Sequence, residues 1–131
     1  MAPVTHYRDL TVWQRAMELA EEVYRVSRLF PKAEEYRVTS QILRSAVSVP
    51  ANIAEGHARS GAREFLHFLS IASGSLAETE TLLLLASRTG LVPKPEILKA
   101  MALADEVGRM IAALKKRLAD RPNPKPQRSR P

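Results

Sequence analysis

The chain has 131 residues, of which 45% are hydrophobic and 26% charged, a composition that supports one folded domain around a single core. It contains no cysteine, which excludes a disulfide framework, a thiolate metal site and a cysteine nucleophile. Residues 1–10 lack the apolar run of a secretory signal, and the longest apolar run, residues 82–86, is far shorter than the ~20 residues that span a membrane. We therefore expect a cytoplasmic protein without a membrane partner.

The formal net charge of +6 is distributed unevenly along the chain. Residues 109–131 hold eight basic residues and one acid, which gives +7, whereas residues 1–108 are close to neutral at −1. Such an asymmetry indicates a cationic segment that meets an anionic partner. The candidate nucleic-acid-binding residues are therefore Lys115, Lys116, Arg117, Arg121, Lys125, Arg128 and Arg130.

The apolar residues recur three and four positions apart, which predicts helices throughout the chain. The first helix is predicted to begin near residues 9–11, because Thr11 and Gln14 have the spacing of a capping box, and to end before Pro31. The second helix follows after a short connection, with Tyr36 as its first apolar residue.

Pro50 lies inside the second predicted helix. The helical spacing of apolar residues continues across this proline, so we expect a kink near residues 46–50 rather than two separate helices. Gly56 and Gly61 bracket the next expected turn, and a third helix is predicted over about residues 62–88.

A fourth helix, opened by Pro93 and Pro95, completes a set of four helices joined by short connections. This arrangement is typical of an all-α, antiparallel, up-down-up-down four-helix bundle. We predict an N-terminal extension over residues 1–8, the bundle over residues 9–120, and a disordered tail rich in proline and arginine over residues 121–131.

The third predicted helix is apolar on more than one side near its C-terminal end. Contiguous apolar surface beyond what one bundle covers usually marks an interface. The small residues within 70–77 add a stretch where another backbone can come close. We therefore predict self-association, with the candidate interface residues Leu66, Leu82, Leu84 and Leu85.

Two patterns have a weak similarity to metal sites, and we predict neither a metal site, a cofactor nor a catalytic residue. Glu64 and His67 have the Glu-x-x-His spacing of di-iron bundles, but such sites need two copies and the chain has one, so a surface pair is favoured. Glu18, Glu21 and Glu22 resemble an acidic magnesium cluster. Nearby arginines favour a solvated, salt-bridged helix face instead.

The second predicted helix carries a row of polar residues beside its apolar stripe, spaced about four residues apart. These side chains either satisfy backbone groups that the Pro50 kink frees or bond to a neighbouring helix. We interpret this polar edge as structural rather than as a binding site. Its members are Arg44, Ser48, Asn52, Glu55 and Arg59.

Three segments together resemble a known bacterial family: residues 9–14, residues 41–56 with the sequence Asn-Ile-Ala-Glu-Gly at their end, and residues 64–78. The family is the four-helix-bundle proteins encoded in intervening sequences of 23S ribosomal RNA genes, also called S23-like, which includes the accessory variability proteins of diversity-generating retroelements. The resemblance covers about residues 7–115. It implies an antiparallel bundle that assembles into a homopentameric ring and has no enzyme activity.

In the retroelement branch, the resemblance implies a positive ring surface that engages nucleic acid and a reverse transcriptase. The first three predicted helices here are nearly charge-balanced, so we expect any RNA binding through the cationic C-terminal end. The leading hypothesis is thus a non-enzymatic, homo-oligomeric scaffold, pentameric by resemblance and associated with RNA. The alternative is a protein-protein adaptor without nucleic-acid binding.

Overall fold

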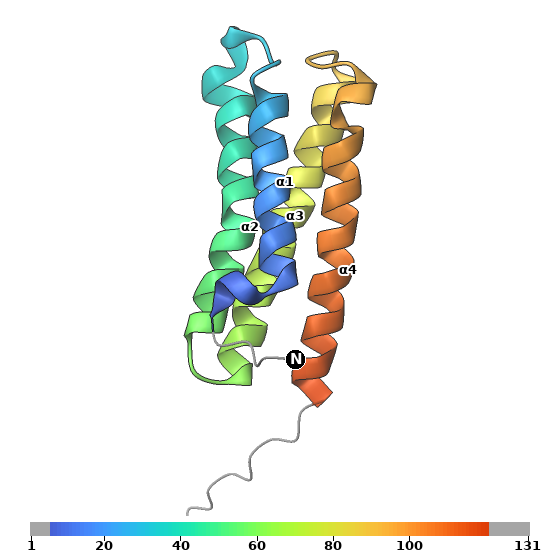
Figure 1. Cartoon of the computed structure of the whole chain (residues 1–131). Coiled ribbons are helices and arrows are strands. Elements are labelled where there is room, and N and C mark those ends of the chain that lie inside the picture. The colour runs from blue at the N-terminus through green and yellow to red at the C-terminus, as the bar shows by residue number, and fades with distance from the viewer. Residues whose placement is uncertain (1–5, 121–131) are drawn as a thin grey trace, which may run out of the picture.

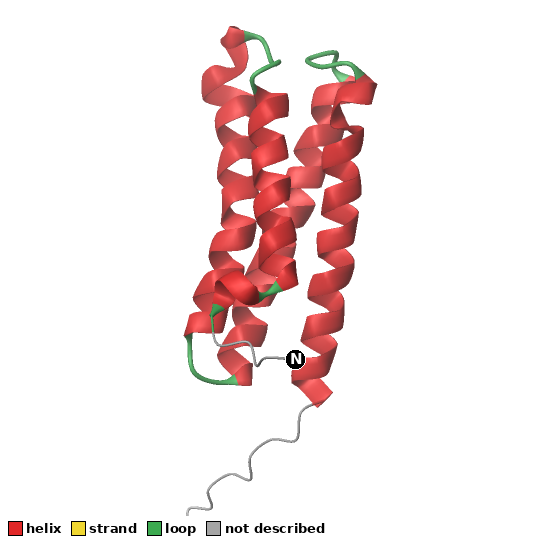
Figure 2. Cartoon of the chain, viewed as in Figure 1, coloured by secondary structure: helices red, strands yellow, loops and turns green. Residues whose placement is uncertain are grey.

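The computed structural model describes residues 6–120 as an antiparallel four-helix bundle (Figure 1). The four helices are α1 (Thr11–Ser27), α2 (Ser40–Ala58), α3 (Ala62–Arg88) and α4 (Leu98–Asp120). Each helix packs against the next around the bundle, and α4 returns to α1. No strand occurs among the described residues (Figure 2), so the predicted all-α bundle is confirmed. The predicted tail lies outside the described residues.

The start of α1 lies where the sequence placed it, but the predicted capping box is wrong. The N-cap residue is Leu10, and no side chain caps the helix. A short 3-10 turn, Tyr7–Asp9, precedes α1 and brings the Arg8 carbonyl close to the helix start. The Gln14 side-chain amide donates to that carbonyl at 2.8 Å and is thereby drawn away from the helix N-terminus.

The segment that leads into α2 is less regular than predicted. A 3-10 turn, Lys32–Glu34, runs into a π turn, Glu35–Thr39, in which Arg37 has a non-helical backbone (φ −118°, ψ −106°). The π turn rotates the residues before Ser40 relative to the rest of α2, and the Tyr36 side chain is 89% exposed. The prediction that Tyr36 is the first apolar residue of the buried side of this helix is therefore wrong. Beyond Ser40, α2 is continuous across Pro50, as expected, while the bend at the proline stays a prediction.

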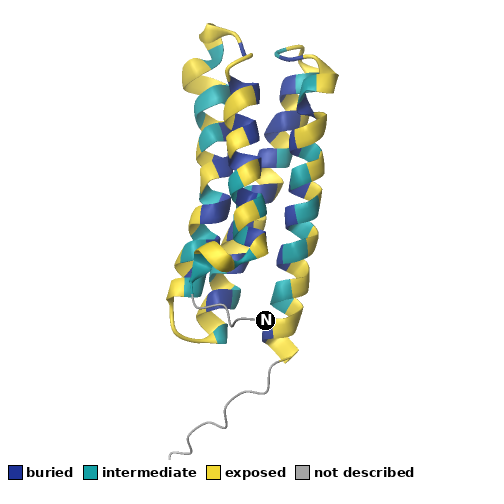
Figure 3. Cartoon of the chain, viewed as in Figure 1, coloured by how far each residue is buried: buried dark blue, intermediate teal, exposed yellow. Residues whose placement is uncertain are grey.

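The core runs along the whole bundle, with one buried stripe on each helix facing the axis (Figure 3). Burial of each large aliphatic side chain stabilises the fold by roughly 1.5–3 kcal/mol. The largest fully buried side chains are Leu19, Ile42, Ile53, Leu69, Leu83, Ile97 and Ile111.

Gly56 does not begin a turn, because α2 continues to Ala58. It is buried where α2 meets α3, and a Cβ atom at this position would lie 2.7 Å from Cβ of Phe68. The turn instead depends on Gly61, whose φ of +116° lies in the region that favours glycine. Gly74, in the small-residue stretch of α3, faces open space, so within the chain the close helix approach occurs at Gly56.

By length and composition, α3 is a candidate membrane span, because it has 27 residues and an 18-residue window within it has a mean hydropathy of 1.2. In the bundle, however, α3 packs against both α2 and α4. Its Thr79 side chain is fully buried and bonds to Ser45 of α2 at 2.9 Å. The core of the bundle therefore accounts for one side of α3, while Ile71, Leu84 and Leu85 are exposed.

Substitution of Gly56 by alanine tests the close approach of α2 and α3. The added methyl group has no room beside Phe68, so Gly56→Ala should destabilise the fold by about 1–3 kcal/mol. Gly74→Ala is the matched control, because the same change in open space should stabilise α3 by about 0.5–1 kcal/mol. Urea denaturation of both variants measures the difference, and equal effects would contradict the close approach.

Candidate functional site

The cationic end of the described chain lies on the last turns of α4. Lys115 is half-buried, Lys116 and Arg117 are exposed, and none of the three forms an ion pair within residues 6–120. Arg109, by contrast, pairs with Asp105 at 3.3 Å. The other predicted nucleic-acid-binding residues lie outside the described residues; they are Arg121, Lys125, Arg128 and Arg130.

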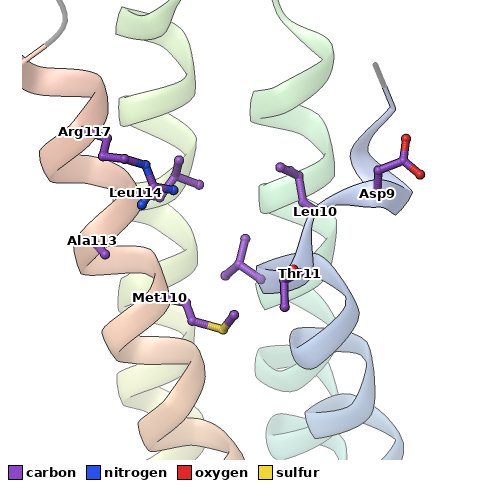
Figure 4. A pocket seen from close by; sticks show the side chains of 8 residues that line it. Asp9, Leu10, Thr11, Met110, Ala113, Leu114 and Arg117 are labelled. Atoms are coloured by element: carbon purple, nitrogen blue, oxygen red, sulfur yellow. The ribbon is translucent and has the colours of Figure 1, made fainter. Parts of the chain in front are cut away.

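A hollow of about 470 Å³ opens beside this cationic end, between the start of α1 and the end of α4 (Figure 4). Leu10 and Thr11 face it from one side, and Met110, Leu114 and Arg117 face it from α4. A neighbouring hollow of about 310 Å³ shares Leu10 and Leu114 and extends to the turn between α2 and α3. This end of the bundle is therefore open and mostly apolar, with a cation at its edge.

The two hollows at this end combine apolar and charged lining residues. The larger hollow holds one cation, Arg117, and one carboxylate, Asp9, among apolar neighbours. Within residues 6–120, no group of three or more histidine, aspartate or glutamate side chains lies close enough to hold a metal ion. The arrangement can hold an apolar group or an anion beside a guanidinium.

The polar edge of α2 bonds partly to itself and partly to α3. The Asn52 side-chain amide donates to the Ser48 carbonyl at 2.8 Å and to the Ser48 hydroxyl at 2.9 Å. Ser75 of α3 donates to the same hydroxyl at 2.8 Å. Asn52 thus holds the Ser48 hydroxyl in position for α3. Pro50 has no N–H to donate to the carbonyl of Ala46, and Asn52 bonds to Ser48 rather than to that carbonyl.

Arg59 joins the end of α2 to the start of α3. Its guanidinium contacts Glu55 at 2.7 Å and Glu64 at 3.4 Å, and it lies 5.0 Å from the ring centre of Phe68. The hydrogen bond to Glu55 raises the pKa of Arg59. Glu64, which the sequence placed in a Glu-x-x-His pattern, therefore forms an ion pair with Arg59. The remaining member of the polar edge, Arg44, contacts Ser40 of its own helix at 3.5 Å.

Sequence reasoning missed a second pair of hydroxyls on the same seam. Ser45 of α2 and Thr79 of α3 are buried, and their oxygens lie 2.9 Å apart. Each hydroxyl is also within hydrogen-bond distance of a carbonyl of its own helix, at 3.1 Å for Ser45 and 2.9 Å for Thr79. One hydroxyl can donate across the seam while the other donates to its own helix. The sequence feature that could have predicted this pair is a hydroxyl residue at a core-facing position of each helix.

Two of the three acidic residues of α1, Glu18 and Glu22, are salt-bridged, as the favoured interpretation predicted, whereas Glu21 has no ion-pair partner within residues 6–120. Arg15 pairs with Glu18 at 2.8 Å, and Arg25 pairs with Glu22 at 2.7 Å. Both arginines also reach carboxylates next to α1, at 3.1 Å for Arg15 and 3.2 Å for Arg25; these are Glu106 of α4 and Glu96 of the turn before it. The expectation of a fully solvated face is wrong for Glu22, which is buried.

The four candidate interface leucines of α3 separate into different environments. Leu84 and Leu85 are exposed, and Leu66 is half-buried against the core. Leu82 is buried within the chain, so its apolar character is explained by the bundle itself. We therefore remove Leu82 from the candidate interface.

The fold and this end of the molecule define a class of small helical bundle with an open, partly apolar end beside a cation. The chain belongs to the family of 23S rRNA-intervening sequence proteins, whose family model matches residues 8–113. The resemblance deduced from residues 9–14, 41–56 and 64–78 is thus confirmed. The relation to retroelement accessory proteins stays a prediction.

A solved structure supports the same assignment. It is the crystal structure of a protein with unknown function from the S23 ribosomal protein family of Bacteroides thetaiotaomicron. That protein is 25% identical to this chain, with a TM-score of 0.75, and the match covers 81% of this chain and 99% of that one. No curated protein matches the sequence.

The hydroxyl pair Ser48 and Ser75 should show measurable coupling. In a double-mutant cycle, Ser48→Ala and Ser75→Ala should couple by about 0.5–1.5 kcal/mol in the free energy of unfolding, because either change alone removes the same interhelical bond. A second cycle that combines Ser48→Ala with Ser70→Ala is the control, since Ser70 is exposed on α3. Coupling of equal size in both cycles would count against the bond.

Proposed function

We propose that this chain is a non-enzymatic, homo-oligomeric scaffold of five copies, which works in the cytoplasm and associates with RNA through the cationic end of α4. The observation that carries the RNA part is the run of Lys115, Lys116 and Arg117, which have no ion-pair partner within residues 6–120. These three cations are consecutive in the sequence, whereas Arg109, earlier on the same helix, is neutralised by Asp105.

The scaffold part rests on exposed apolar surface and on the absence of an assembled reactive centre in the described residues. Leu84 and Leu85 lie side by side in sequence near the end of α3, and both are exposed. Burial of such surface favours association. The proposed number of five copies comes from the resemblance to the family. Assembly would strengthen RNA binding, because each copy brings its own cationic end and many weak phosphate contacts act together.

Native mass spectrometry tests the self-association. We expect wild type at a multiple of the 14.6 kDa chain, five for the proposed ring, and Leu84→Glu with Leu85→Glu at one chain. Ile71→Glu is the matched control, because Ile71 is similarly exposed but lies more than three helical turns before Leu84 on α3. Wild type at one chain over the whole concentration range would overturn the scaffold proposal.

RNA binding is tested by the salt dependence of affinity for a single-stranded RNA. Each phosphate contact contributes about −0.7 to the slope of log affinity against log salt, so Lys115→Ala, Lys116→Ala and Arg117→Ala together should reduce its size by about 2. A chain that ends at Asp120 should also bind more weakly, because it lacks four more cations.

The control for the RNA experiment removes three exposed lysines at the opposite end of the bundle, Lys32, Lys94 and Lys99. This variant has the same net charge as the triple substitution on α4, and its salt slope should stay at the wild-type value. Equal loss in both variants would indicate nonspecific charge attraction. Wild type that assembles but does not bind RNA would instead support the protein-protein adaptor.

A further inference from the structure

The outer surface between α1 and α2 contains an apolar groove of about 360 Å³. Tyr24 and Val47 in its lining are 42% and 43% exposed, which is high for large apolar side chains in a packed bundle. We call this feature the α1/α2 groove, and its apolar lining comes from Met17, Ala20, Tyr24, Val47 and Pro50.

A second exposed apolar surface lies on the other helix pair. Leu84 of α3 and Leu98 of α4 are 40% and 54% exposed. Asp105 of α4 lies near enough to Glu80 for its charge to raise the pKa of the Glu80 carboxyl. Leu84 follows Glu80 by one helical turn, so Leu84 lies on the side of α3 that is next to α4. We call this surface the α3/α4 face and define it by Leu84, Leu98 and Glu80.

The helix order places these two surfaces on opposite sides of the molecule. Each helix packs against its neighbours in the order α1, α2, α3, α4 and back to α1, so the α1/α2 pair is opposite the α3/α4 pair. Tyr24, Leu84 and Leu98 all lie toward the same end of the bundle, where α1 and α3 end and α4 begins (Figure 1). Two different surfaces on opposite sides suit a head-to-tail contact, which closes into a ring when the rotation permits.

Each surface holds a charged side chain without a partner of opposite sign. The groove is lined by one acid, Glu21, and one cation, Arg28, which lie about two helical turns apart; Arg28 is exposed and has no ion-pair partner within residues 6–120. Glu80 on the opposite face is half-buried, and no cation pairs with it in the same residues. Burial raises the pKa of the Glu80 carboxyl, and the charge of nearby Asp105 adds to this shift. A half-buried carboxylate beside another acid is unfavourable until a cation reaches it.

We propose that the α1/α2 groove of one copy receives the α3/α4 face of the next copy, with Arg28 of the first paired with Glu80 of the second. The contact rests on the proposed homo-oligomer and specifies how its copies meet. Leu84 and Leu98 would cover Tyr24 and Val47, and one unpaired cation would neutralise one unpaired acid at each interface. Because the two surfaces differ, every copy uses both of them.

Charge reversal tests the ion pair. Arg28→Glu and Glu80→Arg, each alone, place like charges at every interface and should weaken assembly about tenfold or more in native mass spectrometry at varied protein concentration. The double variant restores opposite charges and should recover the wild-type mass. The controls are Arg44→Glu and Glu78→Arg, which lie on the α2/α3 side and should assemble as wild type does.

A mixing experiment tests the head-to-tail arrangement itself. Tyr24→Asp blocks the groove and leaves the α3/α4 face intact, whereas Leu84→Asp does the reverse, so each variant alone should be a single chain. An equal mixture should form a complex with one copy of each and nothing larger, because one functional groove and one functional face remain. Far-ultraviolet circular dichroism of each variant confirms that the bundle is folded.

The outcomes separate this contact from the proposed function. Wild type that assembles while the groove and charge-reversal variants assemble equally well would overturn the contact and leave the scaffold standing. Variants that dissociate but form no complex on mixing would also overturn it, because a contact between identical surfaces behaves in that way. Wild type at a single chain would overturn both the contact and the self-association, while the RNA measurement remains independent.

Discussion

The close seam between α2 and α3 sets the geometry on which the other helices depend. Phe68 of α3 can approach α2 closely because Gly56 has no Cβ atom at this point. Two hydroxyl pairs bridge the same seam, Ser45 with Thr79 at 2.9 Å and Ser48 with Ser75 at 2.8 Å. Serine side chains are short, so such bonds form only when two helix backbones are near each other. A larger residue at position 56 would separate the helices and lengthen both hydroxyl contacts.

The contact between α1 and α4 is of a different kind. Long side chains span it: Arg15 reaches a carboxylate of α4 and Arg25 reaches one in the turn before α4, 91 and 71 residues away in the sequence. These pairs are exposed, so they orient the helices more than they stabilise them. At the end where such pairs stop, α1 and α4 leave an open hollow beside the cations of α4. The molecule thus has one tightly joined side and one open end.

The helices and their order could be predicted from the sequence because helical periodicity is a local property. The errors occurred where a few residues depart from that regularity. The 3-10 turn before α1 offers a carbonyl to which the Gln14 side chain donates, whereas a capping box would have this side chain accept from a backbone N–H. The π turn before α2 places Tyr36 outside the core. Gly56 was interpreted as a turn residue because a glycine in sequence does not reveal whether it needs a positive φ or a close neighbour.

By itself, the sequence determined the all-α class, the four helices, the concentration of positive charge after residue 108 and the family to which the chain belongs. Only the tertiary structure decided which side chains meet: Leu82 lies in the core while Leu84 and Leu85 do not, Ser48 bonds to Ser75, and Glu80 is half-buried without a cation. The physical reason is that periodicity identifies the apolar side of a helix, whereas burial at its margins and pairing across a seam depend on the position and spacing of the neighbouring helices.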